Sequence, residues 1–385
     1  MKKFVDRLIG KYLIRSAKQF PVVFLSGPRR AGKTTLLRKT FPKADYILLD
    51  ALDLIDRVRM DPRGFLETVS TPVILDEIQH IPELLPYIKE YVDKNENKKG
   101  QFLITGSQSI SLMKGVTESL AGRVAIYELL PFSVQENHNV NILNGGFPEI
   151  VLGKIDKDIW FSSYLKTYVE KDILGMFHIK NLPVFRRFLS ILASRVGALL
   201  NKAEIAASLG VSVPTVGEWV SILEMTGIIT LIYPFYNNFG KRLVKSPKVY
   251  FLDTGLLCYL LGIKNRKQLM ESIFLGQIFE SFIASELIKL KSIPENQFDL
   301  FFFRTYQGQE IDFVVVFPYG KTIFLEVKAV RTLRPEITKN IQELIGKIEK
   351  AQGYIVYLSG KTKEVYNKIG NITAITEKQL LSILK

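Results

Sequence analysis

Residues 27–35 read Gly-Pro-Arg-Arg-Ala-Gly-Lys-Thr-Thr and fit the pattern G-x-x-x-x-G-K-[ST]. The apolar run Pro21–Ser26 before them predicts a buried strand, and Thr34–Thr40 predicts the start of a helix. In this strand–loop–helix context the pattern predicts a phosphate-binding loop, because backbone N–H groups and the positive end of the helix point at the same anion. The competing interpretation is a basic, glycine-rich turn that opens an ordinary helix.

The side chains of this loop are predicted to have separate roles. Lys33 is expected to reach the β- and γ-phosphates of ATP, and Thr34 to offer its hydroxyl to Mg²⁺. The predicted nucleotide-binding residues are Gly27, Pro28, Arg29, Arg30, Ala31, Gly32, Lys33, Thr34 and Thr35.

A second motif occurs where the first requires it. Residues 71–77 read Thr-Pro-Val-Ile-Leu-Asp-Glu, which predicts a buried parallel strand whose carboxyl end opens at the ligand crevice. Asp76 is predicted to hold Mg²⁺, directly or through water, and Glu77 to orient and deprotonate the attacking water. The alternative is that the two carboxylates merely begin the next helix.

Two further residues are candidates for a role in phosphoryl transfer. Gln101–Thr105 predicts a strand. In strand-inserted P-loop ATPases, a polar residue at the tip of the strand beside the phosphate strand senses the γ-phosphate, and Gln101–Thr105 is the candidate for that strand. Ser107 is the first candidate and Thr105 the second, although hydroxyl residues at strand ends also cap helices. Arg123, from the same or a neighbouring subunit of a homo-oligomer, is predicted to offset charge on the γ-phosphate; a solvated surface arginine is the alternative.

Length and composition bound the remaining possibilities. The 385 residues suggest two or three domains, and 47% hydrophobic with 23% charged residues indicates a folded protein. The net charge of +14 favours a polyanionic partner, with DNA as the predicted nucleic acid, although a basic balance also serves solubility.

Membrane, disulfide and zinc chemistry are not expected. No apolar run approaches the roughly 20 residues that span a bilayer, and charged residues interrupt Met1–Phe20, so a cytoplasmic location without a signal peptide is predicted. Cys258 is the single cysteine, which excludes an intrachain disulfide. The histidines are too scattered for a zinc site; they are His80, His138 and His178.

The middle of the chain predicts a helix-turn-helix followed by a β-rich wing. Asn201–Gly210 and Val213–Thr226 read as two helices, and Ile228–Asp253 as the wing. If this segment binds DNA, the residues predicted to lie towards the groove are Ser212, Thr215, Glu218 and Ser221, and those predicted to meet phosphates are Lys241, Arg242, Lys245 and Lys248. The groove-facing set is poor in Arg and Lys, and a protein-contact module is the alternative.

The last third of the chain brings acidic residues and a lysine onto neighbouring strands. Asp312 enters the predicted strand Ile311–Phe317, and Glu326 and Lys328 lie two residues apart on the next, so they share a face. With Glu280 on the preceding helix, this pattern resembles the PD-(D/E)xK nuclease core. In such a core Asp312 and Glu326 would hold a divalent ion, and Lys328 would stabilise or activate the nucleophile. An edge strand with a solvated charged face, or a degenerate nuclease that still binds DNA, remains open.

As a whole, the sequence resembles the AAA+-like ATPases of bacteria and archaea that carry a C-terminal restriction-endonuclease-like domain of unknown function. The resemblance rests on GPRRAGKTT, VILDEIQ, ITGSQS, SLAGR–ELLPFS and GGFPE at Gly145–Glu149, together with the C-terminal pattern. Relatives commonly have Arg-Asp where this chain has Lys171-Asp172.

This resemblance implies an α/β chain of three parts. They are a P-loop NTPase domain over residues 1–150, a helical and winged-helix middle region over 151–265, and an α/β restriction-endonuclease-like domain over 266–385. The predicted function is Mg-ATP hydrolysis coupled to a DNA-associated, nuclease-like domain. A nucleotide-switched regulatory or scaffold protein with an inactive C-terminal domain is the alternative.

Overall fold

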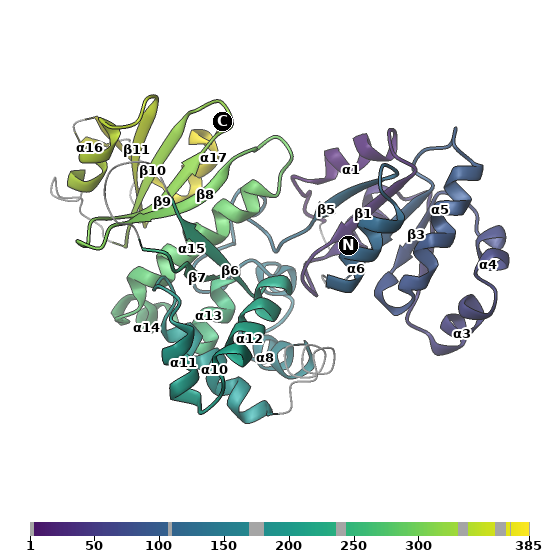
Figure 1. Ribbon diagram of the computed structural model, residues 1–385, viewed down its shortest axis with the longest axis horizontal. Coiled ribbons are helices and arrows are strands. Elements are labelled where there is room, and N and C mark those ends of the chain that lie inside the picture. The colour runs from purple at the N-terminus through teal and green to yellow at the C-terminus, as the bar shows by residue number, and fades with distance from the viewer. Residues whose placement is uncertain are drawn as a thin grey trace. The chain divides into compact units, whose positions relative to one another are not determined.

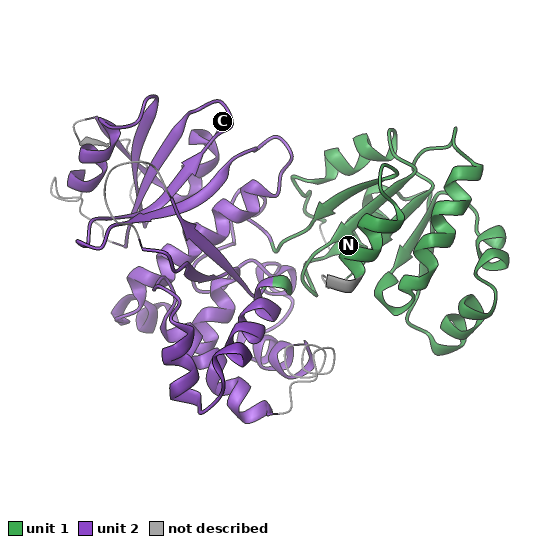
Figure 2. Cartoon of the chain, in the orientation of Figure 1, with its two compact units in different colours: residues 1–131, 225–227 green, residues 132–224, 228–385 purple. Residues whose placement is uncertain are grey.

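The computed structural model describes residues 4–106, 110–168, 181–235, 244–329, 338–358, 367–369 and 371–384. The chain divides into two compact units, one of residues 1–131 with 225–227 and one of residues 132–224 with 228–385 (Figure 2). The middle and C-terminal segments that the sequence separates near residue 265 therefore lie within one compact unit.

The first unit alternates strands and helices (Figure 1). Its elements are α1 (Gly10–Ala17), β1 (Val22–Ser26), α2 (Lys33–Thr40), β2 (Asp45–Leu48), α3 (Leu52–Met60), α4 (Pro62–Thr68), β3 (Val73–Asp76), the 3₁₀ turns η1 (Ile78–His80) and η2 (Pro82–Leu84), α5 (Leu85–Lys94), β4 (Phe102–Thr105), α6 (Ile110–Ser119) and β5 (Val124–Glu128).

All five strands of this unit are parallel and lie in the order β2-β3-β4-β1-β5. The sheet confirms the predicted strands at the phosphate-binding loop and at Asp76. It also places β4 beside β1, where the sequence predicted a strand next to the phosphate strand. Because all strands are parallel, their carboxyl ends meet at a single edge of the sheet.

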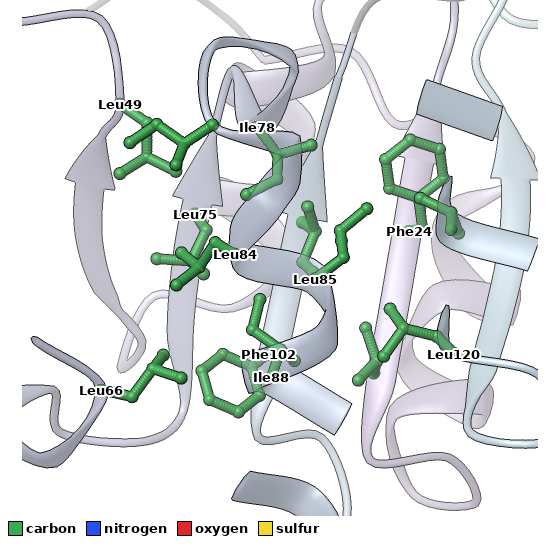
Figure 3. Packing of buried hydrophobic residues seen from close by; sticks show 14 of the residues in the cluster. Phe24, Leu49, Leu66, Leu75, Ile78, Leu84, Leu85, Ile88, Phe102 and Leu120 are labelled. Carbon is green, nitrogen blue, oxygen red and sulfur yellow. The ribbon is translucent and has the colours of Figure 1, made fainter. Parts of the chain in front are cut away.

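Two hydrophobic cores cover the two faces of this sheet. Alternate residues of β1 point to opposite sides: Phe24 joins one core and Val23 the other. The larger core packs α5 onto the sheet, with Leu85 and Ile88 close to Phe102 (Figure 3). Burial on both faces explains why β1, β3 and β4 read as largely continuous apolar runs.

The second unit begins with helices and ends with a large sheet (Figure 1). Its elements are α7 (Pro148–Val151), α8 (Lys157–Tyr164), α10 (Leu182–Ser194), α11 (Lys202–Leu209), α12 (Val213–Met225), β6 (Ile229–Pro234), β7 (Lys248–Phe251), α13 (Thr254–Leu260), α14 (Arg266–Glu271), α15 (Leu275–Lys291), β8 (Asp299–Arg304), β9 (Glu310–Val316), β10 (Thr322–Lys328), α16 (Lys339–Ile345), β11 (Ala351–Tyr357), β12 (Asn367–Ile369), β13 (Ile372–Thr376), η5 (Glu377–Gln379) and α17 (Leu380–Ile383).

Eight strands of this unit form one mixed sheet in the order β12-β13-β11-β10-β9-β8-β6-β7. β8, β9 and β10 are antiparallel neighbours, and β11 returns parallel to β10 after α16. β6 pairs with β7 in a hairpin and also, in parallel, with β8. The predicted wing strands therefore extend the C-terminal sheet.

The helices α11 and α12 match the two helices predicted for a helix-turn-helix. Asn201 caps α11 with its side chain, and Gly210 ends it in the left-handed conformation at φ 69°. Over the described chain, no single helix has the length and apolar character to cross a membrane; α11 and α12 meet that criterion only as a pair, bent by 109°.

Two of the motifs that carry the family resemblance are anchored by buried charges. In GGFPE, the N–H of Gly146 donates to Asp253 at 2.7 Å, and a Cβ at Gly145 would lie 2.1 Å from the same carboxylate, so a side chain there is excluded. After ELLP, the N–H of Val134 donates to Glu286 at 2.9 Å. Lys289 donates to Glu286 at 2.8 Å and to the carbonyl of Phe132 at 3.0 Å. Both motifs therefore fix the first residues of the second unit.

Candidate functional site

The loop predicted to bind phosphate, residues 27–32, joins β1 to α2, as the strand–loop–helix pattern predicts. Gly27 and Gly32 have positive φ angles of 144° and 96°, at which the backbone of a residue with a side chain would be strained. A Cβ at Gly27 would also lie 2.2 Å from the carbonyl oxygen of Leu129. Arg7 steadies the loop from outside, because its guanidinium donates to the carbonyls of Ala31 at 3.1 Å and Leu130 at 2.5 Å.

Lys33 begins α2 with its ammonium group inside the loop. It is 6% exposed and donates to the carbonyls of Gly27 at 2.9 Å and Pro28 at 3.1 Å. Burial lowers the pKa of Lys33 to about 8, against the opposing attraction of Glu77 and Asp76. An anion bound in the loop would replace the carbonyls as the partner of this cation.

Three hydroxyl groups converge on the buried carboxylate of Asp76. Thr34 donates to its Oδ2 at 2.9 Å, Tyr46 from β2 to the same oxygen at 2.8 Å, and Thr105 from the end of β4 to Oδ1. Burial and the carboxylate raise the pKa of Tyr46. Arg38 lies 4.8 Å from the centre of the Tyr46 ring. A hydroxyl and a carboxylate held this close are the oxygen ligands that suit Mg²⁺.

Glu77 follows Asp76 with a left-handed backbone at φ 63°, which is uncommon outside glycine. Its N–H donates to Thr105 Oγ1 at 3.2 Å, and its carboxylate accepts a hydrogen bond from Gln79. Thr105 therefore connects the two carboxylate residues of the second motif. Ser107, the first candidate for the γ-phosphate sensor, lies outside the described residues.

Arg123 lies at the edge of the sheet away from the loop. The N–H of Val22, at the start of β1, donates to the Arg123 carbonyl, which places Arg123 at the amino end of that strand. β1 has five residues, and at about 3.3 Å each they separate this end from Gly27 by about 16 Å. Its guanidinium pairs with Asp93, with Nη2 3.0 Å from Oδ2. The prediction that Arg123 acts on nucleotide bound to its own chain is therefore wrong; action on a neighbouring subunit stays a prediction.

In the second unit, β9 and β10 bring the predicted nuclease-like residues together. The register pairs Phe324 with Val314, and its continuation sets Glu326 opposite Asp312. Asp312 accepts from the N–H of Val327 at 2.7 Å, and Lys328 donates to Glu326 at 2.6 Å. Burial and neighbouring carboxylates raise the pKa of Asp312 and, to a lesser degree, of Glu326.

One buried oxygen in this cluster has no hydrogen-bond partner among the described residues. It is Oε2 of Glu326, whose side chain is only 10% exposed. Such an atom costs free energy unless a proton, a water or a cation satisfies it. Across the described residues, no three or more His, Cys, Asp or Glu side chains form a group that could hold a metal ion.

Lys248 corrects one prediction made for the wing. It is 2% exposed and pairs with Glu280 at 2.9 Å and Glu310 at 2.6 Å, so it cannot meet DNA phosphates. Lys241 and Arg242 lie outside the described residues, while Lys245 is exposed.

The residues predicted to face a DNA groove lie on the outer side of α12. Ser212, Glu218 and Ser221 are exposed, and Thr215 is half-buried. The Ser212 hydroxyl accepts from the Thr215 N–H at 3.2 Å, which makes Ser212 an N-cap. Lys171 and Asp172 lie outside the described residues.

The model of an AAA domain matches residues 19–138. Two domains of unknown function, DUF8612 and DUF4143, match residues 136–267 and 275–377. The uncharacterized protein Rv2008c of Mycobacterium tuberculosis is 34% identical over 355 residues, which cover 90% of this chain and 78% of Rv2008c. The chain belongs to the Rv2008c family. The first unit is thus an AAA+-like P-loop ATPase domain.

A more distant similarity is found to an archaeal protein and to a solved structure. The uncharacterized protein MJ1544 of Methanocaldococcus jannaschii is 24% identical over 332 residues, covering 75% of this chain and 70% of MJ1544. The Walker-type ATPase PABY2304 of Pyrococcus abyssi is 16% identical, with a TM-score of 0.46, and the match covers 67% of this chain and 96% of that one.

The sequence did not predict the contacts of three residues at the two sites. Tyr46 lies on a strand beside β3, and only the strand order shows that it reaches Asp76. Arg7 and Lys248 bind partners more than twenty residues away. The signal for Lys248 was its place at the start of an apolar strand, Lys-Val-Tyr-Phe, where an unpaired lysine would be costly.

Proposed function

We propose that this protein hydrolyses Mg-ATP in its first unit and couples the reaction to a DNA-associated, nuclease-like site in its second. The observation that carries the first half is the convergence of Lys33, Thr34, Asp76, Glu77 and Thr105 at one edge of the parallel sheet. This edge is where open α/β sheets bind ligands.

Each residue at this edge has a role that its contacts support. Lys33 and the loop N–H groups bind the phosphates, while Thr34 and Asp76 provide the oxygen ligands for Mg²⁺, which neutralises charge on the β- and γ-phosphates. Glu77 accepts the proton of the attacking water. Thr105 is well placed as the γ-phosphate sensor, since it contacts both Asp76 and Glu77.

Steady-state hydrolysis and nucleotide binding test these roles. Lys33→Ala is expected to abolish binding, whereas Glu77→Gln retains binding and loses turnover. Lys39→Ala, an exposed lysine on the same helix, and Glu83→Gln, an exposed glutamate, are the matched controls. Hydrolysis by Glu77→Gln at the normal rate would show that another group activates the water.

The second half of the proposal rests on Asp312, Glu326 and Lys328. The unpartnered Glu326 oxygen and the facing Asp312 suit a divalent ion that would polarise a phosphodiester, with Lys328 beside the nucleophile. In the full chain with Mn²⁺, Asp312→Asn and Lys328→Met should lose cleavage of plasmid or single-stranded DNA, while the exposed Asp299→Asn should not. No cleavage by the wild type would favour the alternative of a nucleotide-switched regulator.

DNA association is supported by the net charge of +14. Affinity should fall with salt and fall again when Lys241, Arg242 and Lys245 are all changed to Gln. The control changes Lys264, Arg266 and Lys267, which removes the same charge elsewhere. Equal losses in the two triple variants would leave only a general electrostatic effect. DNA-stimulated ATP hydrolysis would support coupling.

A further inference from the structure

The nuclease-like site contains a buried cation that its own sequence motif does not include. Lys248 comes from β7 of the middle segment and lies between Glu280 of α15 and Glu310 of β9, at 2.9 Å and 2.6 Å. It is 2% exposed. A lysine this deeply buried is tolerated because carboxylates pair with it on two sides.

Glu280 is held by this lysine and by one further donor. Tyr250, two residues along β7, donates its hydroxyl to Glu280 Oε1 at 2.5 Å, and Lys248 donates to the same oxygen. Glu310 is similarly engaged, with Arg304 3.4 Å from its other oxygen. Both glutamates therefore have protein cations as partners.

Asp312 and Glu326 are less fully paired, although Lys328 is a partner of Glu326 as well. Lys328 is 4.0 Å from Asp312 and bonds only one oxygen of Glu326, whose other oxygen is the unpartnered one. Among the described residues, these four carboxylates face three cations: Lys248, Lys328 and Arg304. An added cation would therefore be favourable beside Asp312 and Glu326. Near Glu280, the ammonium of Lys248 would repel a second cation.

We infer that Lys248 is a positioning residue that reserves Glu280 and Glu310 for itself and makes the C-terminal site a one-ion site held by Asp312 and Glu326. This inference rests on the proposed nuclease-like function and specifies its ligands. It leaves Glu280, the glutamate of the nuclease-like pattern that lies on α15, outside the metal shell. It also makes the site dependent on a strand from the middle segment.

The number of bound Mn²⁺ ions tests the inference without reference to cleavage. We would titrate Mn²⁺ into the nucleotide-free full chain and measure free Mn²⁺ by electron paramagnetic resonance. All variants would carry Lys33→Ala and Asp76→Asn to silence the first unit. The reference chain should bind one ion, Asp312→Asn should weaken binding at least tenfold, and Glu280→Gln should change it less than about twofold.

Lys248→Met should release Glu280 and Glu310 and thereby allow a second ion or at least tenfold tighter binding. Tyr250→Phe removes a donor from Glu280 without changing charge and should still bind one ion. If Lys248→Met fails to fold, as thermal unfolding would show, the comparison of Glu280→Gln with Asp312→Asn decides.

Three results would overturn the inference alone: two ions in the reference chain, a loss in Glu280→Gln equal to that in Asp312→Asn, or unchanged binding of one ion by a folded Lys248→Met. Binding of no Mn²⁺ by the reference chain would overturn it together with the metal site of the proposed function, so the two failures are distinguishable.

Discussion

Replacing Thr105 by Val tests the centre of the ATPase site with almost no change in side-chain shape. Thr105 is fully buried, donates to Asp76 and accepts the N–H of Glu77 at 3.2 Å. Valine would leave Asp76 with one donor fewer and the Glu77 N–H without its acceptor. A hydrogen bond to a charged group contributes about 1.5–3 kcal/mol, which corresponds to roughly a 10- to 100-fold loss in kcat if Thr105 holds Asp76 in its working position.

The assay separates turnover from binding and from folding. We expect kcat to fall by this factor, with KM and the affinity for a fluorescent ATP analogue changed by less than about threefold, because Lys33 and the loop remain. The free energy of unfolding should fall by about 1–3 kcal/mol. Thr105→Ser keeps the hydroxyl and should retain most activity. A wild-type kcat in Thr105→Val would refute the role assigned to this hydroxyl.

Three further predictions follow from other contacts. Burial holds the pKa of Lys33 at about 8 in the nucleotide-free protein, and a bound phosphate would raise it. ATP binding above pH 8 should therefore take up a proton. The affinity for ATP should then fall as pH rises from 8 to 9.5. Calorimetry in buffers of different ionisation enthalpy measures the uptake, and Lys33→Arg should flatten the slope; a pH-independent wild type would contradict this. Tyr46→Phe should raise the Mg²⁺ concentration for half-maximal hydrolysis about 2- to 10-fold at unchanged maximal rate, since one donor to Asp76 is lost; identical Mg²⁺ curves would exclude this role for Tyr46. Glu286→Gln should lower the free energy of unfolding by about 3–5 kcal/mol, because Lys289 would become an unpaired buried charge. In denaturant titrations, the double variant Glu286→Gln, Lys289→Met should recover part of this loss. A Glu286→Gln variant as stable as the wild type would contradict a stabilising role for the Glu286–Lys289 ion pair.

The local parts of the ATPase site were predictable, because their residues are neighbours in the sequence. Gly27–Thr35 and the strand ending in Asp76 each form one continuous motif, and the structure brings them together as predicted. Tyr46 was not predictable in this way, because its contact depends on strand order rather than on spacing.

The position of Arg123 could have been predicted from strand direction. This residue directly precedes β5, so in a parallel sheet it must lie at the amino edge, while the phosphate-binding loop follows the carboxyl end of β1. Strand direction alone excludes it from its own nucleotide site.

In the C-terminal site, the positions of Glu326 and Lys328 were predicted correctly, but that of Lys248 was not. The i, i+2 spacing correctly set Glu326 and Lys328 side by side. A basic residue at the start of a wing-like strand, however, was interpreted as a phosphate contact. Only the pairing of β6 with β8 shows that Lys248 lies inside the sheet layer, where it needs carboxylate partners.

The pairing of β6 with β8 also determines where this chain can be cut. A fragment of residues 266–385 would lose β6 and β7, and the backbone N–H and C=O groups of β8 that pair with Tyr233 and Pro234 would face water. An open strand edge of this kind invites pairing with other chains. Such a fragment is therefore expected to aggregate, whereas one that starts at residue 132 retains the whole sheet and should remain monodisperse.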